Sequence, residues 1–135
     1  MTRALQMVHE VDPKREIMDR VAPYLDNVQV LAAEVLLAIY VRPEKTAGGI
    51  YLSGGKGHTR HEDVYQGKVG LVLKVGPIAF SEDSTHRFGG VVPQVGDWVA
   101  LRVGDSFQLA VGDQPCRIAE DINFKLILKD PDAVI

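Results

Sequence analysis

Residues 35–41 read Val-Leu-Leu-Ala-Ile-Tyr-Val, an uninterrupted apolar run that is rich in residues favouring β-structure. Arg42 and Pro43 follow, and proline has no backbone N–H to donate within a sheet. A run of this length suits a strand covered on both faces better than it suits a helix. The sequence therefore predicts a buried strand here, with the rest of the domain built around it.

The chain downstream of this run is divided by glycines into short β-like segments. Residues 64–76 alternate apolar and polar side chains and contain internal glycines, which usually mark a bend, as at barrel corners. The tripeptide Val-Gly-Asp occurs at 95–97, 103–105 and 111–113, with pieces of strand length between, which predicts successive turns of a meander. A last strand is expected over residues 122–128. The pattern is typical of an all-β fold, here a small β-barrel with a short N-terminal α-helical extension.

The N-terminal region contains one helical pattern. Asp12 and Pro13 suit the start of a helix, and apolar side chains then recur at helical spacing. Pro23 falls within this pattern and predicts that the helix kinks or stops just before it. We therefore divide the chain into an N-terminal helical arm, 1–33, and a barrel domain, 34–135. The apolar face of the helix either covers the domain itself or docks on a neighbouring subunit.

The composition limits the classes of partner. The 135 residues suit a single domain, and 46% of them are hydrophobic and 24% charged, as in ordinary globular proteins. A net charge of −3 provides no general basic surface, so nucleic acid is not an expected partner. No apolar run approaches the roughly 20 residues that cross a membrane, and none resembles a secretory signal. With one cysteine, Cys116, an internal disulfide is excluded, and we expect a cytoplasmic protein.

Residues 46–57 read Thr-Ala-Gly-Gly-Ile-Tyr-Leu-Ser-Gly-Gly-Lys-Gly and place three bulky apolar side chains between two glycine pairs. The polar residues 58–63 follow, so the whole segment 46–63 is predicted to be a mobile loop. Two interpretations of the apolar triplet, residues 50–52, stay open. It is presented to a hydrophobic surface on another molecule, or it is a short core strand with a glycine turn at each end.

No pattern of catalytic or metal-binding residues stands out in the sequence. The glycine-rich segment departs from a phosphate-binding loop, because Ile50 replaces its first glycine and Gly57 replaces its magnesium-binding Ser or Thr. His58 and His61 lie in a polar segment without a second cluster that would complete a metal site. Cys116 has no histidine near it in the sequence, so we expect a small buried or half-buried residue. We expect no enzymatic activity, no cofactor and no metal.

In their order along the chain, these segments resemble the small co-chaperonin family, the GroES-like lids of chaperonin rings. The likeness covers roughly residues 35–129 and depends on several landmarks rather than on one motif. Residues 47–52 look like the mobile-loop signature of the family, a Gly-Gly pair followed by Ile, a variable residue and Leu. The other landmarks are the first barrel strand at 35–41, the strand before the roof hairpin at 66–76, the characteristic turn and strand at 95–101 and the closing strand at 122–128.

The resemblance implies a β-barrel subunit of a seven-membered ring, in which first and last strands pair between neighbours. It implies that the chaperonin-binding residues are Gly48, Gly49, Ile50, Tyr51 and Leu52. It implies a subunit interface formed by Val35, Leu37, Ile39, Val41, Phe124, Leu126 and Leu128. Residues 77–92 would form a roof-type loop. The resemblance further implies that the partner is a chaperonin ring, which supplies the nucleotide chemistry, and that this chain performs no catalysis.

Some features depart from the family pattern and are typical of a divergent, phage-encoded member. They are the helix-bearing residues 1–33, the bulky Tyr51 and the longer loop after Leu52. The first hypothesis is a co-chaperonin that caps a chaperonin in the cytoplasm, the host cytoplasm for a phage protein, and assists protein folding or capsid assembly. The alternative is a virion structural protein built on the same barrel. It would decorate the capsid or belong to the connector, with coat or connector proteins as partners.

Overall fold

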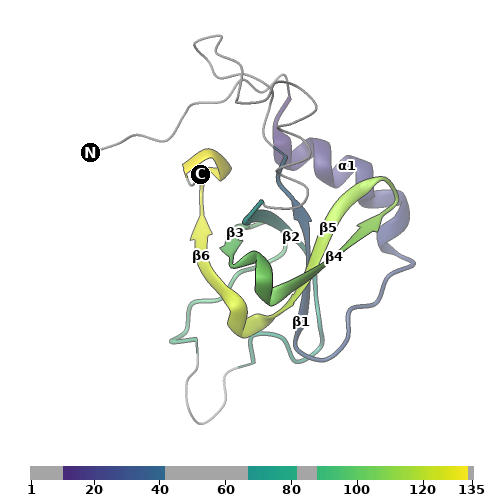
Figure 1. Ribbon diagram of the computed structural model, residues 1–135. Coiled ribbons are helices and arrows are strands. Elements are labelled where there is room, and N and C mark those ends of the chain that lie inside the picture. Colours follow the sequence, from purple (N-terminus) through teal and green to yellow (C-terminus); the bar gives the residue numbers. More distant parts are fainter. Residues whose placement is uncertain (1–10, 42–66, 82–87, 134–135) are drawn as a thin grey trace.

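The computed structural model describes residues 11–41, 67–81 and 88–133. The described chain contains one α-helix and six β-strands (Figure 1). They are α1 Pro13–Leu25, β1 Glu34–Ile39, β2 Val69–Val75, β3 Trp98–Leu101, β4 Ser106–Val111, β5 Gln114–Glu120 and β6 Phe124–Leu128. Three short 3-10 helices are also present: η1 Val103–Asp105, η2 Asp121–Asn123 and η3 Pro131–Ala133.

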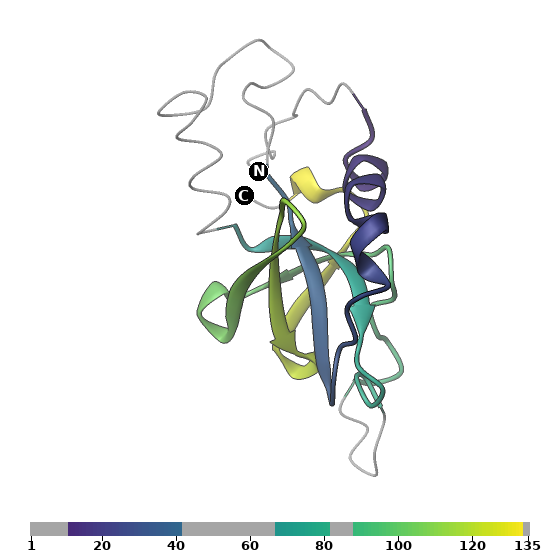
Figure 2. The ribbon, with the colours of Figure 1, turned by 90° about the vertical axis from the view of Figure 1, so that its right-hand side faces the viewer.

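All six strands belong to one antiparallel sheet with the order β4-β5-β1-β2-β3-β6. Strand β1 lies inside the sheet between β5 and β2, whereas β4 and β6 lie at its two ends. The sheet is strongly curled, and α1 lies against its outer side (Figure 1, Figure 2). The predicted β-rich fold with one short N-terminal helix is confirmed. Closure of the sheet into a barrel stays a prediction.

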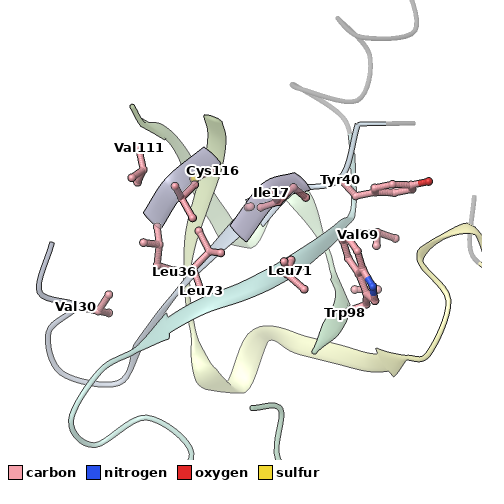
Figure 3. Close-up of a cluster of buried hydrophobic side chains, with 13 residues drawn as sticks. Ile17, Val30, Leu36, Tyr40, Val69, Leu71, Leu73, Trp98, Val111 and Cys116 are labelled. Atoms are coloured by element: carbon pink, nitrogen blue, oxygen red, sulfur yellow. The ribbon is translucent and has the colours of Figure 1, made fainter. Parts of the chain in front are cut away.

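Buried apolar side chains form two clusters, one on each face of the sheet. The outer cluster lies between the sheet and α1 and includes Leu36 and Cys116 (Figure 3). The inner cluster lies on the other face and includes Val35 and Val99. Successive side chains of a strand point to opposite faces, so β1 contributes to both clusters, and from Val35 to Ile39 no residue is more than 1% exposed. The predicted strand covered on both faces is confirmed.

Helix α1 packs against the sheet of its own subunit. Ile17 and Val21 are buried in the outer cluster, with Leu25 partly buried beside them. The helix ends at Leu25 rather than before Pro23, because this proline lies in the last turn and removes only one backbone donor there. Of the two interpretations of the amphipathic face, the structure supports coverage of the domain itself.

Polar contacts also attach α1 to the sheet. The buried side chain of Gln114, at the start of β5, accepts a hydrogen bond from Arg20 Nη1 at 2.6 Å. Lys74 Nζ, in β2, donates to the carbonyls of Leu25 and Val28 at 2.6 and 2.7 Å. The last carbonyls of a helix have no partners within it, so this lysine satisfies groups that would otherwise need water. The middle and the C-terminal end of the helix are therefore held by the sheet.

The three Val-Gly-Asp tripeptides mark chain reversals but not a meander. Residues 95–97 and 111–113 are turns with glycine at positive φ, and residues 103–105 form η1. The first lies just before β3 in the connection from its neighbour β2, and the third joins the neighbours β4 and β5, but the second lies between β3 and β4, which do not pair. The predicted meander is wrong. A turn sequence fixes where the chain reverses but not which strand it joins next.

The expected excursion over residues 77–92 is anchored to the inner cluster on both of its described flanks. The ring of Phe80 packs edge-on against that of Phe88, with centroids 5.4 Å apart, and lies 6.0 Å from that of Phe124. The backbone N–H of Phe80 donates to Asp121 Oδ2 at 2.8 Å. Residues 82–87 lie outside the described part of the chain.

Candidate interaction surfaces

The predicted partner-binding loop is inserted between two neighbouring strands. Strand β1 ends at Ile39 and β2 begins at Val69, and the two pair in antiparallel fashion. The backbone N–H of Tyr40 donates to the carbonyl of Val69 at 2.9 Å, so the pairing extends to the point where the chain leaves the sheet. The predicted binding residues, Gly48, Gly49, Ile50, Tyr51 and Leu52, lie outside the described residues.

The base of this insertion is held by the C-terminal segment. The ring of Tyr40 packs edge-on against Trp98, with centroids 5.3 Å apart (Figure 3). Its hydroxyl hydrogen-bonds to Asp132 Oδ1 in η3, where Pro131 is buried. The side chain at the end of β1 is thus fixed by β3 on one side and by η3 on the other. The sequence does not indicate this contact, because Tyr40 and Asp132 are far apart along the chain and belong to no common motif.

The residues of the predicted subunit interface fall into two groups. Val35, Leu37 and Ile39 lie in β1 and are buried within their own subunit, and Val41 is half-buried just beyond the strand. Since β1 is hydrogen-bonded to β5 and β2, neither of its edges is open to a strand of a neighbouring subunit. The second group, Phe124, Leu126 and Leu128, lies in β6 at one end of the sheet.

Both end strands of the sheet expose large apolar side chains. Leu126 and Ile127 in β6 are 49% and 43% exposed, and Phe107 in β4 is 60% exposed. Within the described residues, β6 pairs only with β3, and β4 only with β5. Sequence analysis singled out neither Phe107 nor Ile127. Exposure of an apolar strand residue becomes visible only when the strand order is known.

Three carboxylates gather where β1 begins and β5 ends. Glu34 lies directly opposite Glu120 in the antiparallel pairing, and Asp121 follows in η2. Burial raises the pKa of Glu34 above 4.5, and the carboxylates of Glu120 and Asp121 raise it further. One oxygen of Glu34 and one of Asp121 are buried without a hydrogen-bond partner in the described structure. No group of three His, Cys, Asp or Glu residues in the described ranges is arranged to hold a metal ion.

Cys116 lies in β5 and is fully buried in the outer cluster. Burial raises the pKa of its thiol to about 11, and the thiol donates a weak hydrogen bond to the carbonyl of Gln114 at 3.4 Å. The thiolate is the nucleophilic form of cysteine, so this thiol has little reactivity near neutral pH. The expectation of a buried structural cysteine is confirmed. His58 and His61 lie outside the described residues.

Within the described residues, the geometry defines a class of protein by its fold: a small antiparallel β-domain with one covering helix, a long insertion between two neighbouring strands and, at each end of the sheet, a strand paired on one edge. No helix in the described ranges has both the length and the apolar character needed to span a membrane. The chain matches no protein-family model and no curated protein.

Proposed function

We propose that this chain is a co-chaperonin-like ring subunit of the GroES-like type, encoded by a phage. Its loop residues Ile50, Tyr51 and Leu52 dock in an apolar groove of a chaperonin ring, which the assembled lid then caps. The chain has no chemistry of its own, and the chaperonin hydrolyses the nucleotide. The lid acts in the cytoplasm of the host and assists protein folding or capsid assembly.

One observation supports this function most strongly. Residues 40–68 connect β1 to β2, although antiparallel neighbours can be joined by a turn of about two residues. Loops longer than about 12–15 residues are uncommon in compact domains and are often functional. This connection contains the glycine-flanked apolar triplet at 50–52 and the polar segment 58–63. A fixed base that carries an apolar triplet on a long tether fits a docking element.

The energetics fit a removable lid. Full burial of one Ile or Leu side chain contributes about 1.5–3 kcal/mol, and ordering each loop residue costs about 1–2 kcal/mol. A single loop therefore binds weakly. In a ring the other loops face a high effective concentration of sites once the first has docked, so the whole ring binds tightly. Weak single contacts also allow the lid to be released.

The test is a substitution that places a charge in the docking triplet. Ile50→Asp should abolish co-elution of the chain with a chaperonin ring in the presence of nucleotide, because the groove cannot solvate a carboxylate. Thr59→Asp is the matched control, since it adds the same charge to the same connection outside the triplet and should leave binding unchanged. The native mass of each variant without chaperonin should equal that of the wild type. Unchanged binding by Ile50→Asp would remove the proposal.

The alternative is a virion structural protein built on the same domain, and two sequence features motivate it: a helical arm suited to clasping a neighbour and the apolar tail 133–135. Ile17 and Val21 of α1 are buried against their own sheet, so the apolar face of the helix needs no neighbour. We therefore keep the co-chaperonin as the proposal. Detection of the chain in purified particles, together with no binding to chaperonin, would replace it with the virion hypothesis.

A further inference from the structure

The two ends of the sheet are open in the described structure. Strands β4 and β6 each have a hydrogen-bonded neighbour on one side only, so a row of backbone N–H and C=O groups on each is unpaired there. Natural proteins usually protect such edges with charges, prolines, bulges or covering segments, because an open edge invites pairing with another chain. An edge with little of this protection is a candidate interface.

Strand β6 has the side chains of an internal strand. Leu126 lies opposite Ala100 on the face of the outer cluster, and Ile127 lies opposite Val99 on the face of the inner cluster. Ala100 and Val99 are buried, but Leu126 and Ile127 are nearly half exposed although they point to opposite faces. A strand that is apolar on both faces is typical of one whose two faces are covered, and a further strand on the open edge of β6 would bring side chains that cover Leu126 on one face and Ile127 on the other. The strand carries one charge, Lys125, and its pairing with β3 is irregular at that residue, so protection of this edge is confined to one position and leaves Leu126 and Ile127 exposed.

Strand β4 offers a complementary edge. It has six residues and β6 has five, so their ladders are matched in length. It contains no charged residue, so Lys125 of β6 would meet no like charge there. Phe107 is its most exposed apolar side chain, and a large aromatic opposite an aliphatic residue is a favourable cross-strand pair.

The open edges of β4 and β6 face different directions. Asn123 Nδ2 donates to the carbonyl of Asp105 at 3.3 Å, which joins η2 to η1 where β6 and β4 begin. From there the two strands diverge, with β6 on one flank of the molecule and β4 on the other (Figure 1). Each subunit therefore presents two open edges that face different directions.

We propose that β6 of one subunit pairs with β4 of the next, so that the sheet continues from subunit to subunit. This contact pairs both open edges of every subunit, and repetition around a closed ring leaves none unpaired. A symmetric contact of β6 with β6 would leave β4 and Phe107 exposed. The ring closure rests on the proposed function, whereas the strand pairing rests on the two edges alone.

The experiment uses two single variants that each block one edge. Phe107→Asp places a charge on β4, and Leu126→Asp places one on β6; both side chains are exposed, so the fold should tolerate them. Leu31→Asp is the matched control, because Leu31 is 66% exposed and lies outside both edges. Sedimentation velocity gives the assembled mass, and circular dichroism verifies the fold.

The wild type and Leu31→Asp should sediment as the same oligomer. Phe107→Asp alone and Leu126→Asp alone should each sediment as single chains of 14.8 kDa. An equimolar mixture of the two should form a dimer of twice that mass, because the first variant keeps an intact β6 and the second an intact β4. The remaining edges of that dimer are both blocked, so assembly stops there.

Two results would overturn the proposal. One is a wild-type chain that sediments as a monomer, which means that the edges are not used or are covered within the chain. The other is a Phe107→Asp chain that still assembles like the wild type while mixing has no effect, which indicates a symmetric β6 contact. No chaperonin is present, so these failures leave the Ile50→Asp test untouched.

A second pair of variants covers the case in which an aspartate variant fails to fold. Phe107→Cys and Leu126→Cys are mixed and treated with a short bismaleimide, while the buried Cys116 stays unreactive. A cross-linked heterodimer is expected. Cross-linking within each variant alone, with none between them, would contradict the pairing.

Discussion

Replacing Glu34 with glutamine should stabilise the fold at neutral pH. Glu34 lies at the start of β1, directly opposite Glu120 in β5, with Asp121 next to it. One of its carboxylate oxygens is buried and has no hydrogen-bond partner in the described structure. Burial and the two neighbouring carboxylates raise the pKa of Glu34, which means that the folded environment disfavours its charge.

The size of the effect follows from this arrangement. Like charges directly opposite in a sheet are destabilising, and such cross-strand pair terms amount to roughly 0.2–1 kcal/mol. Glutamine keeps the shape of the side chain and removes the charge, so Glu34→Gln should raise the free energy of unfolding by about 0.5–1 kcal/mol at pH 7. That gain corresponds to an increase of about 2–4 °C in the midpoint of thermal unfolding.

The pH dependence has a definite sign. The folded state has the higher pKa at Glu34, so it binds the proton more tightly than the unfolded state does. Ionised Glu34 therefore costs stability above its folded pKa, and the cost disappears below about 4.5, the pKa of the unfolded state, where both states are protonated. The advantage of Glu34→Gln should be full at pH 7 and should vanish as the pH falls through this range.

Urea denaturation of both proteins at pH 7, 5 and 4 measures this difference. Glu120→Gln is a useful control, because it removes the opposing charge from an exposed side chain and should give a smaller gain of the same sign. A Glu34→Gln protein that is less stable at pH 7, or a gain that stays constant down to pH 4, would refute the reasoning. In the first case Glu34 would have a stabilising partner that the carboxylate needs.

Two further predictions concern the buried polar groups of β5. Gln114→Ala should lower the free energy of unfolding by about 2–3 kcal/mol, because the guanidinium of Arg20 and the buried carbonyl of Ile39 each lose a hydrogen-bond partner. A double-mutant cycle with Arg20→Ala, measured by urea denaturation, should give a coupling energy above about 0.5 kcal/mol. Strictly additive losses of stability would contradict this prediction. Cys116 should not react with a thiol reagent at pH 8 in the folded protein, because a pKa of about 11 leaves roughly one thiol in a thousand ionised. It should react fully in denaturant, and fast labelling of the folded chain would show that β5 opens readily.

The sequence predicted best the strand and the helix that the spacing of their own apolar residues determines. Residues 35–41 are continuously apolar, and such a run is stable as a strand only when other parts of the protein cover both of its faces. Strand β1 lies inside the sheet and is buried on both faces. The helix was predictable for the same reason, since its apolar spacing requires a surface. The identity of that surface was not, because the anchoring residue Gln114 is distant in sequence and polar. Nothing in a single sequence indicates that a buried amide will accept from Arg20.

The reason for a glycine was also beyond the sequence. Gly70 was expected to mark a bend, but it lies inside β2, opposite Ile39 and Val99. A Cβ atom at Gly70 would come within 2.2 Å of Leu37 Cδ1 and 2.8 Å of the carbonyl oxygen of Ala38. Gly70 therefore makes room for the core side chain of Leu37 in the neighbouring strand β1. Whether a strand glycine permits a bend or a close approach depends on the register, which the sequence does not state.

The position of β1 also limits how a second copy of this chain can pair with the sheet. A strand has two backbone edges, and each edge forms one hydrogen-bonded ladder. In this fold β5 and β2 occupy both edges of β1, so β1 cannot also pair with a neighbouring subunit while the sheet is intact. An interface that uses the described strands must then be built from β4 or β6. We therefore expect such an interface to contain exposed residues of these strands, namely Phe107, Leu126 and Ile127, rather than the buried Val35 and Leu37.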